Sequence, residues 1–269
     1  MSFLPELRES EAVGETAATY AEIKRLGGVP MVALIYRHFA TLPGALEWFW
    51  DAVGPAWRNG MLQEAAWRVA KASPLPPCVP FDAHELAAAG VDAAARAEIG
   101  IVLEAYNRAN PENMLSMLCV VRLLEGAKTR RPLPARDWTP PGIPQPLAPM
   151  GDVATMPPEV SAMLDRVATA GDGDGPRVIQ SLYRHFLHRP AFLALVVDRI
   201  APRIDDGNVP QAVAALSKAM AREADALVKG MAAPPAPHPG IAPVATRFSG
   251  GVIPQMIVVG RMISSAVGR

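Results

Sequence analysis

The residues best suited to chemistry are two histidines that occur in the same four-letter motif. The sequence YRHF occurs twice, with His38 in the first copy and His185 in the second. A histidine exchanges its proton near neutral pH, so either imidazole is a candidate general base. The alternative is that the YRHF residues pack and hydrogen-bond between helices. This alternative is favoured because both copies retain the motif, whereas an asymmetric active site needs only one.

Asn110 is the third candidate for chemistry. It directly precedes Pro111 and the apolar stretch 112–126, an arrangement typical of a helix N-cap followed by proline at the first helical position. Such a cap uses the side-chain oxygen and leaves the amide NH₂ free to bind water or substrate. The helix N-terminus beside it would also attract a carboxylate. Capping and catalysis both remain open for Asn110.

The two YRHF motifs belong to a longer duplication. Matching residues are separated by 147 positions, as for Tyr36 and Tyr183. Two copies are too few for a solenoid, so we expect a pseudo-dimer whose halves pack about a pseudo-twofold axis. The predicted division is a helical repeat at 1–128, a linker at 129–158 and a shortened second repeat at 159–269.

Apolar residues recur with helical spacing along the chain, and no segment shows the alternation of a strand, so the predicted fold is all-α. Asp82 with Glu85 forms a capping box, and Asp92 caps the helix after it. The segment 129–158 contains nine prolines, which predicts an extended linker. The expected helices span 15–26, 29–39, 44–53, 60–73, 93–107, 112–126, 159–170, 211–231 and 252–267.

The composition excludes several classes of protein. With 26 basic and 26 acidic residues the formal charge is zero, which argues against a nucleic-acid-binding surface. Cys78 and Cys119 lie in unrelated contexts, which predicts no disulfide or metal framework and a reducing compartment. The first residues lack a signal pattern, and no apolar run reaches the ~18 residues of a membrane span. We expect a cytoplasmic protein without a metal, a cofactor, or a membrane or nucleic-acid partner.

Four short segments carry a resemblance to a known family. They read GETAATY (14–20), VP (29–30), ATLPG (40–44) and YNRANP (106–111). Together they resemble the group I 2-haloacid dehalogenases, the DehI family. The resemblance implies an α-helical pseudo-dimer that hydrolyses short 2-halo acids by direct attack of an activated water on the halogen-bearing carbon. It also implies a site between the two halves, with an asparagine from the first repeat and a catalytic aspartate from the second.

Carried over residue by residue, the resemblance puts the family asparagine on Asn110 and the apolar pocket positions on Met31 and Leu34. The aspartate position falls on Ile179 when counted from the preceding GP and on Leu182 when counted back from Pro190. Neither residue is a carboxylate.

A replacement base would have to come from the YRHF helices. Residues 31, 34 or 35, and 38 share one helical face, so Ile35 lines the predicted pocket on the side of His38. In the second copy Val178 lies on the face of Leu182 and His185. Arg247 is a candidate clamp for the substrate carboxylate, and a surface role is the plainer interpretation.

The predicted function is therefore hydrolysis of a short 2-halo carboxylic acid in a pocket between the repeats, with Asn110 positioning water and His185 or His38 as the base. The alternative is a catalytically inactive family member that binds a small acid or apolar ligand there. Formation of a homodimer remains open.

Overall fold

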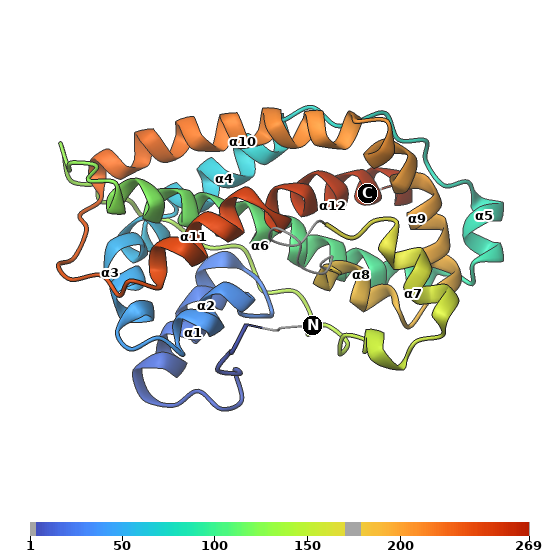
Figure 1. The fold of residues 1–269 in the computed structure, drawn as a ribbon, viewed down its shortest axis with the longest axis horizontal. Coiled ribbons are helices and arrows are strands. Elements are labelled where there is room, and N and C mark those ends of the chain that lie inside the picture. Colours follow the sequence, from blue (N-terminus) through green and yellow to red (C-terminus); the bar gives the residue numbers. More distant parts are fainter. Residues whose placement is uncertain (1–3, 170–178, 269) are drawn as a thin grey trace.

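The computed structural model describes residues 4–169 and 179–268. Within these ranges the chain forms helices and no strand, so the all-α prediction is confirmed (Figure 1). Two short 3₁₀ helices, η1 (Val153–Thr155) and η2 (Val228–Gly230), accompany the α-helices. The α-helices are α1 (Gly14–Gly27), α2 (Leu34–Phe39), α3 (Ala45–Arg58), α4 (Met61–Ala72), α5 (Ala83–Ala88), α6 (Ala93–Leu124), α7 (Pro158–Asp165), α8 (Ser181–Phe186), α9 (Pro190–Asp205), α10 (Asn208–Leu227), α11 (Ile241–Gly250) and α12 (Val252–Val267).

The long helix α6 runs through the middle of the molecule. Its contacts with α12, α11, α10 and α4 are the most extensive between described helices, and Figure 1 shows α6 in green beside α11 and α12 in red. One cluster of buried side chains extends across both halves, from Phe39 of α2 to Phe186 of α8. Apolar burial of this kind is the main stabilising contribution to such a fold. The two halves therefore share one hydrophobic core.

The predicted break at 109–111 is wrong. α6 continues through Pro111, although proline removes one hydrogen bond from a helix and usually bends or ends it. Contacts with neighbouring helices support this segment, including a hydrogen bond of 3.2 Å from Trp67 Nε1 to the carbonyl oxygen of Arg108. Asn110 is therefore not an N-cap, and no helix begins beside it.

Local signals located other helix ends with mixed success. The capping box at Asp82 is present, and the Asp92 carboxylate accepts a bond of 2.7 Å from Ala95 N. α12 has the predicted bounds, but α2 begins at Leu34 instead of Val29, and α10 begins at residue 208 instead of 211. The region between the predicted helices 211–231 and 252–267 contains an unpredicted helix, α11, which begins at Ile241.

The stretch Ile241–Val267 is long and apolar enough, by composition, to cross a membrane. It comprises α11 and α12, which are separated by a kink at Gly251 (φ −109°, ψ −108°). Of its most apolar window, 61% is buried inside the protein. Its position against α6 in the core explains the apolar composition.

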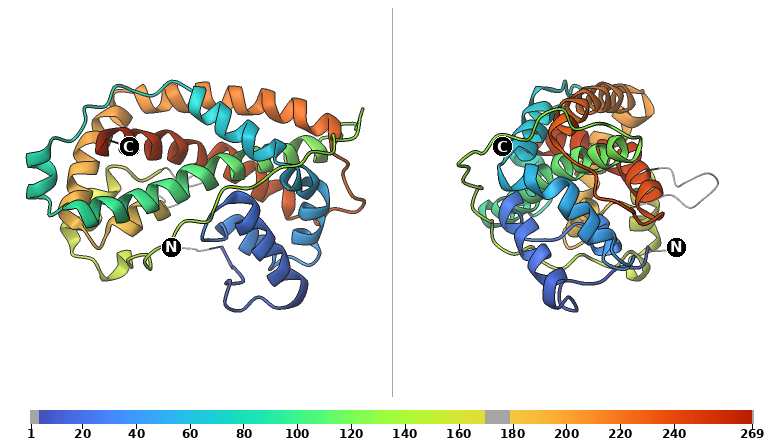
Figure 2. Two further views of the ribbon diagram at one scale, coloured as in Figure 1. Left: turned by 180° about the vertical axis from the view of Figure 1, so that it is seen from behind. Right: turned by 90° about the vertical axis from the view of Figure 1, so that its left-hand side faces the viewer.

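The proline-rich segment carries no α-helix between residues 127 and 152 and crosses the molecule as an extended strap (Figure 2). Near its start Arg130 N donates to the carbonyl of Lys229 at 2.7 Å. Further along, Trp138 lies on Gly60, where any side chain would collide with the indole and φ is +74°. The strap is thus held by specific contacts along its length.

The order of the helices parallels the sequence duplication. α2 and α8 carry the YRHF motifs, and they are followed by α3 and α4 in one half and by α9 and α10 in the other. The pseudo-twofold arrangement and the limits of the two repeats stay predictions.

Candidate functional site

His38 is a buried packing residue. It is 6% exposed, and its Nδ1 lies 2.7 Å from the carbonyl oxygen of Pro5. Its own carbonyl oxygen accepts a bond of 2.8 Å from Thr41 Oγ1. His38 therefore ties the N-terminal segment to α2, as the packing alternative predicts.

His185 has different surroundings. It is half-buried, its ring meets Tyr106 of α6 edge-on with centroids 5.6 Å apart, and its Nδ1 is buried without a hydrogen-bond partner. Burial lowers the pKa of His185 to about 4; a hydrogen bond with the Ala148 backbone opposes this, and the charges of His188 and Arg184 act in the same direction as burial. The imidazole is consequently neutral at pH 7 and can accept a proton.

Two asparagines of α6 lie three residues apart and so share one helical face. Asn110 is 9% exposed, and its Nδ2 has no partner. Asn107 Nδ2 donates to Ser264 Oγ of α12 at 2.8 Å, which orients the amide, whereas Asn107 Oδ1 is buried without a partner. One free donor and one free acceptor therefore stand a turn apart on α6.

Three helices meet around these groups. A Cβ at Gly260 of α12 would lie 2.5 Å from Asn107 Oδ1 and 3.9 Å from the Leu182 side chain of α8, so only glycine allows this approach. The ring contact between Tyr106 and His185 joins α6 to α8 from the other side. We call this region the α6–α8–α12 seam; it comprises Tyr106, Asn107, Asn110, Leu182, His185 and Gly260.

The pKa of Tyr106 shows which charged groups lie near the seam. Burial raises its pKa well above the usual value, opposed by a hydrogen bond with Ser181 and by the positive charges of Arg184 and Arg37. These two arginines are the matching residues of the two YRHF motifs. Arg37 is paired with Glu6 at 3.0 Å, so the positive charge that favours an anionic ligand at the seam comes from Arg184 of α8.

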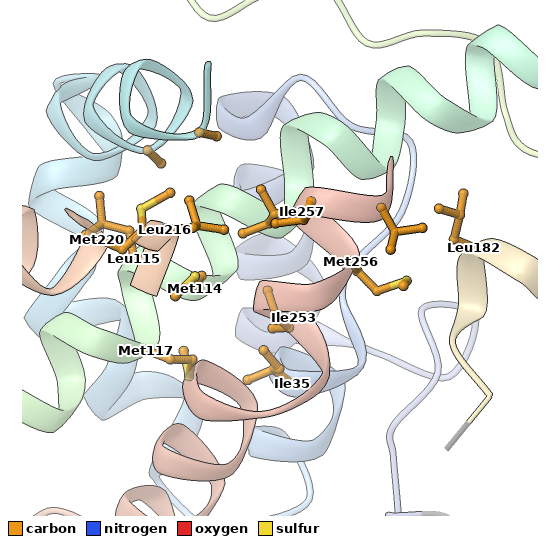
Figure 3. Close-up of a cluster of buried hydrophobic side chains, with 14 of the residues drawn as sticks. Ile35, Met114, Leu115, Met117, Leu182, Leu216, Met220, Ile253, Met256 and Ile257 are labelled. Atoms are coloured by element: carbon orange, nitrogen blue, oxygen red, sulfur yellow. The ribbon is translucent and has the colours of Figure 1, made fainter. Parts of the chain in front are cut away.

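The predicted apolar pocket residues are packed to different degrees. Ile35 and Leu182 are each 1% exposed and belong to the buried cluster of Figure 3, where Ile253 and Met256 of α12 also lie. Met31, Leu34 and Ile179 are half-buried, and Val178 lies outside the described residues. Two surface depressions lie elsewhere, between α4 and α10 and between α1 and α3.

Two further predictions concerned charged groups. Arg247 is exposed in the last turn of α11, a helix that the sequence did not predict. Among the described residues no group of three or more His, Cys, Asp or Glu side chains is placed to hold a metal ion.

Sequence reasoning missed Tyr106 and Asn107 as parts of the site. Both belong to the YNRANP segment, and Asn107 stands one turn before Asn110. Helical periodicity through that segment could have placed them on one face, but the assumed break at 109–111 separated them from Asn110.

Comparison with known proteins supports the resemblance seen in the sequence. No family model matches the chain. A curated relative, the configuration-inverting 2-haloacid dehalogenase of Alcaligenes xylosoxydans xylosoxydans, is 29% identical over 212 residues, which cover 74% of this chain and 69% of the relative. The chain is thus similar to a 2-haloacid dehalogenase over about three quarters of its length.

Solved structures support the same assignment for the fold. A D-2-haloacid dehalogenase mutant superposes with a TM-score of 0.73 at 16% identity, covering 98% of this chain and 96% of that one. A complex of D-2-haloacid dehalogenase with L-LA gives a TM-score of 0.68 at 15% identity, with 98% and 94% covered. The fold is that of the DehI-like proteins, and the predicted resemblance is confirmed.

Proposed function

We propose that this DehI-like relative of the 2-haloacid dehalogenases binds a short 2-substituted carboxylic acid at the α6–α8–α12 seam and hydrolyses 2-halo acids there. The observation that carries the proposal is the set of buried polar atoms without partners: Asn110 Nδ2, Asn107 Oδ1 and His185 Nδ1. Buried polar groups are normally hydrogen-bonded, so unpartnered ones on facing helices point to a ligand or ordered water.

The proposed step needs a base for the attacking water. His185 accepts one proton from water, the water oxygen bonds to C2 of the acid, and the carbon–halogen bond breaks with its electron pair leaving on the halide. A base with a pKa of about 4 matches an ordinary aspartate in strength and is unprotonated at pH 7. His185 can therefore replace a carboxylate thermodynamically.

Asn110 supplies the hydrogen-bond donor in this scheme. Its free NH₂ donates to the water or to the substrate carboxylate, while the nearby charge of Arg184 favours an anion. The neutral hydrophobic side chains of Leu182 and Ile35 keep bulk water away. A desolvated site strengthens each of these electrostatic contacts.

A second candidate function is acid binding without hydrolysis. It is favoured by one observation: the family aspartate position falls on Ile179 or Leu182, both apolar. Binding needs only the donor and the positive charge, whereas hydrolysis also needs the base. A general base contributes about 10²–10⁴-fold to rate, so its loss leaves a binder.

The test is halide release from both enantiomers of 2-chloropropionate and 2-bromopropionate, together with calorimetric binding of 2-chloropropionate. The variants are Asn110→Ala and His185→Ala, with His188→Ala as the matched control. His188 is exposed on the next turn and bonds to the carbonyl oxygen of Pro149 at 2.7 Å.

The proposal expects release by wild type and the control and a loss of 10²-fold or more in both site variants. Binding without release would establish the second candidate function. Neither binding nor release by wild type would overturn both, and release that survives His185→Ala would remove His185 as the base.

A further inference from the structure

Glu112 is a buried carboxyl group that the proposed reaction does not use. It stands two residues after Asn110 on α6, is 1% exposed, and its Oε1 has no partner. Its Oε2 lies so near Gly27 of α1 that a Cβ there would be 2.7 Å away, and the Trp57 ring would be 3.4 Å from the same point. The absence of a side chain at Gly27 is therefore what admits the Glu112 carboxyl.

The surroundings disfavour a negative charge at this place. Gly27 is the last residue of α1, where the helix presents carbonyl oxygens and a partial negative charge. Gln63 Nε2 of α4 already donates to one of these carbonyls, Leu26 O, at 3.3 Å. An ionised Glu112 would add a full negative charge to the same carbonyl-rich end.

The charged groups nearby do little to stabilise an ionised Glu112. Arg108, one turn earlier on α6, is engaged by the carbonyl oxygens of Gly28 and Gly142 and by Glu104. On α2, burial raises the pKa of Tyr36, a hydrogen bond with Ser116 opposes this, and the charge of Glu112 raises it further. Burial raises the pKa of Glu112 well above its usual value, and the charge of Arg108 opposes this only in part.

The basic residues in the last turn of α1 are committed elsewhere. Lys24 pairs with Glu9 at 2.7 Å, and Arg25 pairs with Glu22 at 3.9 Å. Arg58 of α3 also pairs with Glu22, at 2.9 Å. None of these contacts includes the Glu112 carboxyl.

The second half of the chain shows an uncharged version of the same contact. Pro254 and Gln255 of α12 resemble Pro111 and Glu112 of α6, because in each helix a polar residue directly follows a proline, although the pair lies four positions short of the 147-residue register. Gln255 Nε2 donates to the carbonyl oxygen of Val167, just after the end of α7, at 3.4 Å. The Gln255 amide thus contacts the backbone just after the end of α7. The Glu112 carboxyl contacts the end of α1 in a similar way.

We propose that Glu112 is held as a neutral carboxylic acid whose hydroxyl faces the carbonyl end of α1, and that it acts as a positioning residue for Asn110. The two residues lie in the same turn of α6, so the contact of Glu112 with Gly27 fixes the rotation at which Asn110 faces the seam. The positioning role rests on the proposed function, whereas the neutral state of Glu112 does not.

The experiment compares wild type with Glu112→Gln, which keeps the shape and donor but cannot ionise. Glu104→Gln is the matched control on the same helix, since Glu104 is partly exposed and pairs with Arg108. Urea unfolding is followed from pH 5 to 9, and binding of 2-chloropropionate is measured over the same range. Glu112→Ala is included but carries no conclusion alone, because it leaves a cavity.

The expected direction of the pH effect on stability follows from the number of protons that the native and unfolded states bind. Native Glu112 keeps its proton while the unfolded carboxyl, with a pKa of about 4.3, releases it. Wild type therefore loses stability as pH rises, by up to tenfold in the unfolding constant per pH unit until the native group ionises. Glu112→Gln should lack this component at every pH, and Glu104→Gln should retain it.

For the ligand, Glu112→Gln should bind as tightly as wild type near pH 6 and keep its affinity at pH 9, where wild type weakens. An identical pH dependence of stability in wild type and Glu112→Gln would overturn the neutral-acid assignment. A Gln variant with the expected stability but at least tenfold weaker binding at all pH values would overturn the positioning role. If no variant binds the acid, the proposed function fails together with the positioning role, and the stability data still decide the state of Glu112.

Discussion

The same YRHF motif forms α2 in one half and α8 in the other, but the two histidines end in different surroundings. Both helices accept an incoming backbone at the same place: Leu7 N donates to Arg37 O and Gly151 N to Arg184 O, each at 3.0 Å. His38 bonds to its incoming segment through Nδ1, whereas His185, which also hydrogen-bonds with the Ala148 backbone, leaves its Nδ1 unpartnered beside α6. A duplicated motif can thus keep its packing role in both copies and gain a reactive group in only one.

The largest losses of stability should come from truncation of the buried phenylalanine that both copies of the motif share. Phe39 is fully buried against Phe49 in one half, and Phe186 is 1% exposed against Phe192 in the other. Truncation to alanine should cost about 3–5 kcal/mol of unfolding free energy at either position. Urea denaturation of the two variants checks this, and a loss at one position of less than half that at the other would refute their equivalence.

Substitution of the two histidines should then distinguish the two copies of the motif by the size of the stability loss. His38→Ala removes the hydrogen bond with the part-buried carbonyl of Pro5 and the packing of a buried ring, and should cost about 1–3 kcal/mol. His185→Ala loses an edge-on ring contact with Tyr106, worth about 0.5–1.5 kcal/mol. Thermal denaturation gives the ranking, with His188→Ala as the exposed control. A larger loss at 185 than at 38 would contradict the assignment of roles.

Acid should test the lowered pKa of His185. Native His185 has a pKa of about 4, and the unfolded residue has one of about 6.5. As pH falls below about 6.5 the unfolded state binds the proton first, so stability decreases until about pH 4 and then levels off. The slope is below about 1.4 kcal/mol per pH unit, because the ring is partly exposed and solvent screens it. His185→Gln should flatten this part of the profile in denaturation measured from pH 4 to 7; an unchanged slope would refute the lowered pKa.

The smallest effect concerns the two motif arginines. Arg37 pairs with Glu6 at 3.0 Å, whereas Arg184 Nε donates to the carbonyl of Gly151 at 3.2 Å. Glu6→Gln should cost about 0.2–1 kcal/mol, and the cost should shrink in 1 M salt because ions screen a partly exposed pair. Denaturation at low and high salt measures this. A cost that does not respond to salt would show that the ion pair is not what stabilises the N-terminal segment.

The parts of the fold that could be predicted are those that depend on contacts between residues close together in the sequence. Asp82 and Asp92 cap helices through residues three positions away, and both caps were predictable. The break assigned at Pro111 was wrong because packing by α4, α10, α11 and α12 outweighs the lost hydrogen bond. Helix α11 was not predicted because the prolines that precede it are typical of a loop.

The candidate site was predictable only in part, for the same reason. Family resemblance located Asn110, and the duplicated motif located His185. The contacts that give these residues their character join Tyr106 to His185 and Asn107 to Gly260. Such pairings are set by the packing of whole helices, and the periodicity of any one segment does not contain them.

The continuity of α6 has a consequence for synthesis of the protein. The surface of α6 that α11 and α12 cover is made early in translation, and its partners follow only after the proline strap and the helices α7 to α10. Until then a long apolar surface stays uncovered on the nascent chain, which is a state prone to aggregation and to binding by chaperones. Ribosome-bound chains that stop before α11 should therefore be the species that most need a chaperone.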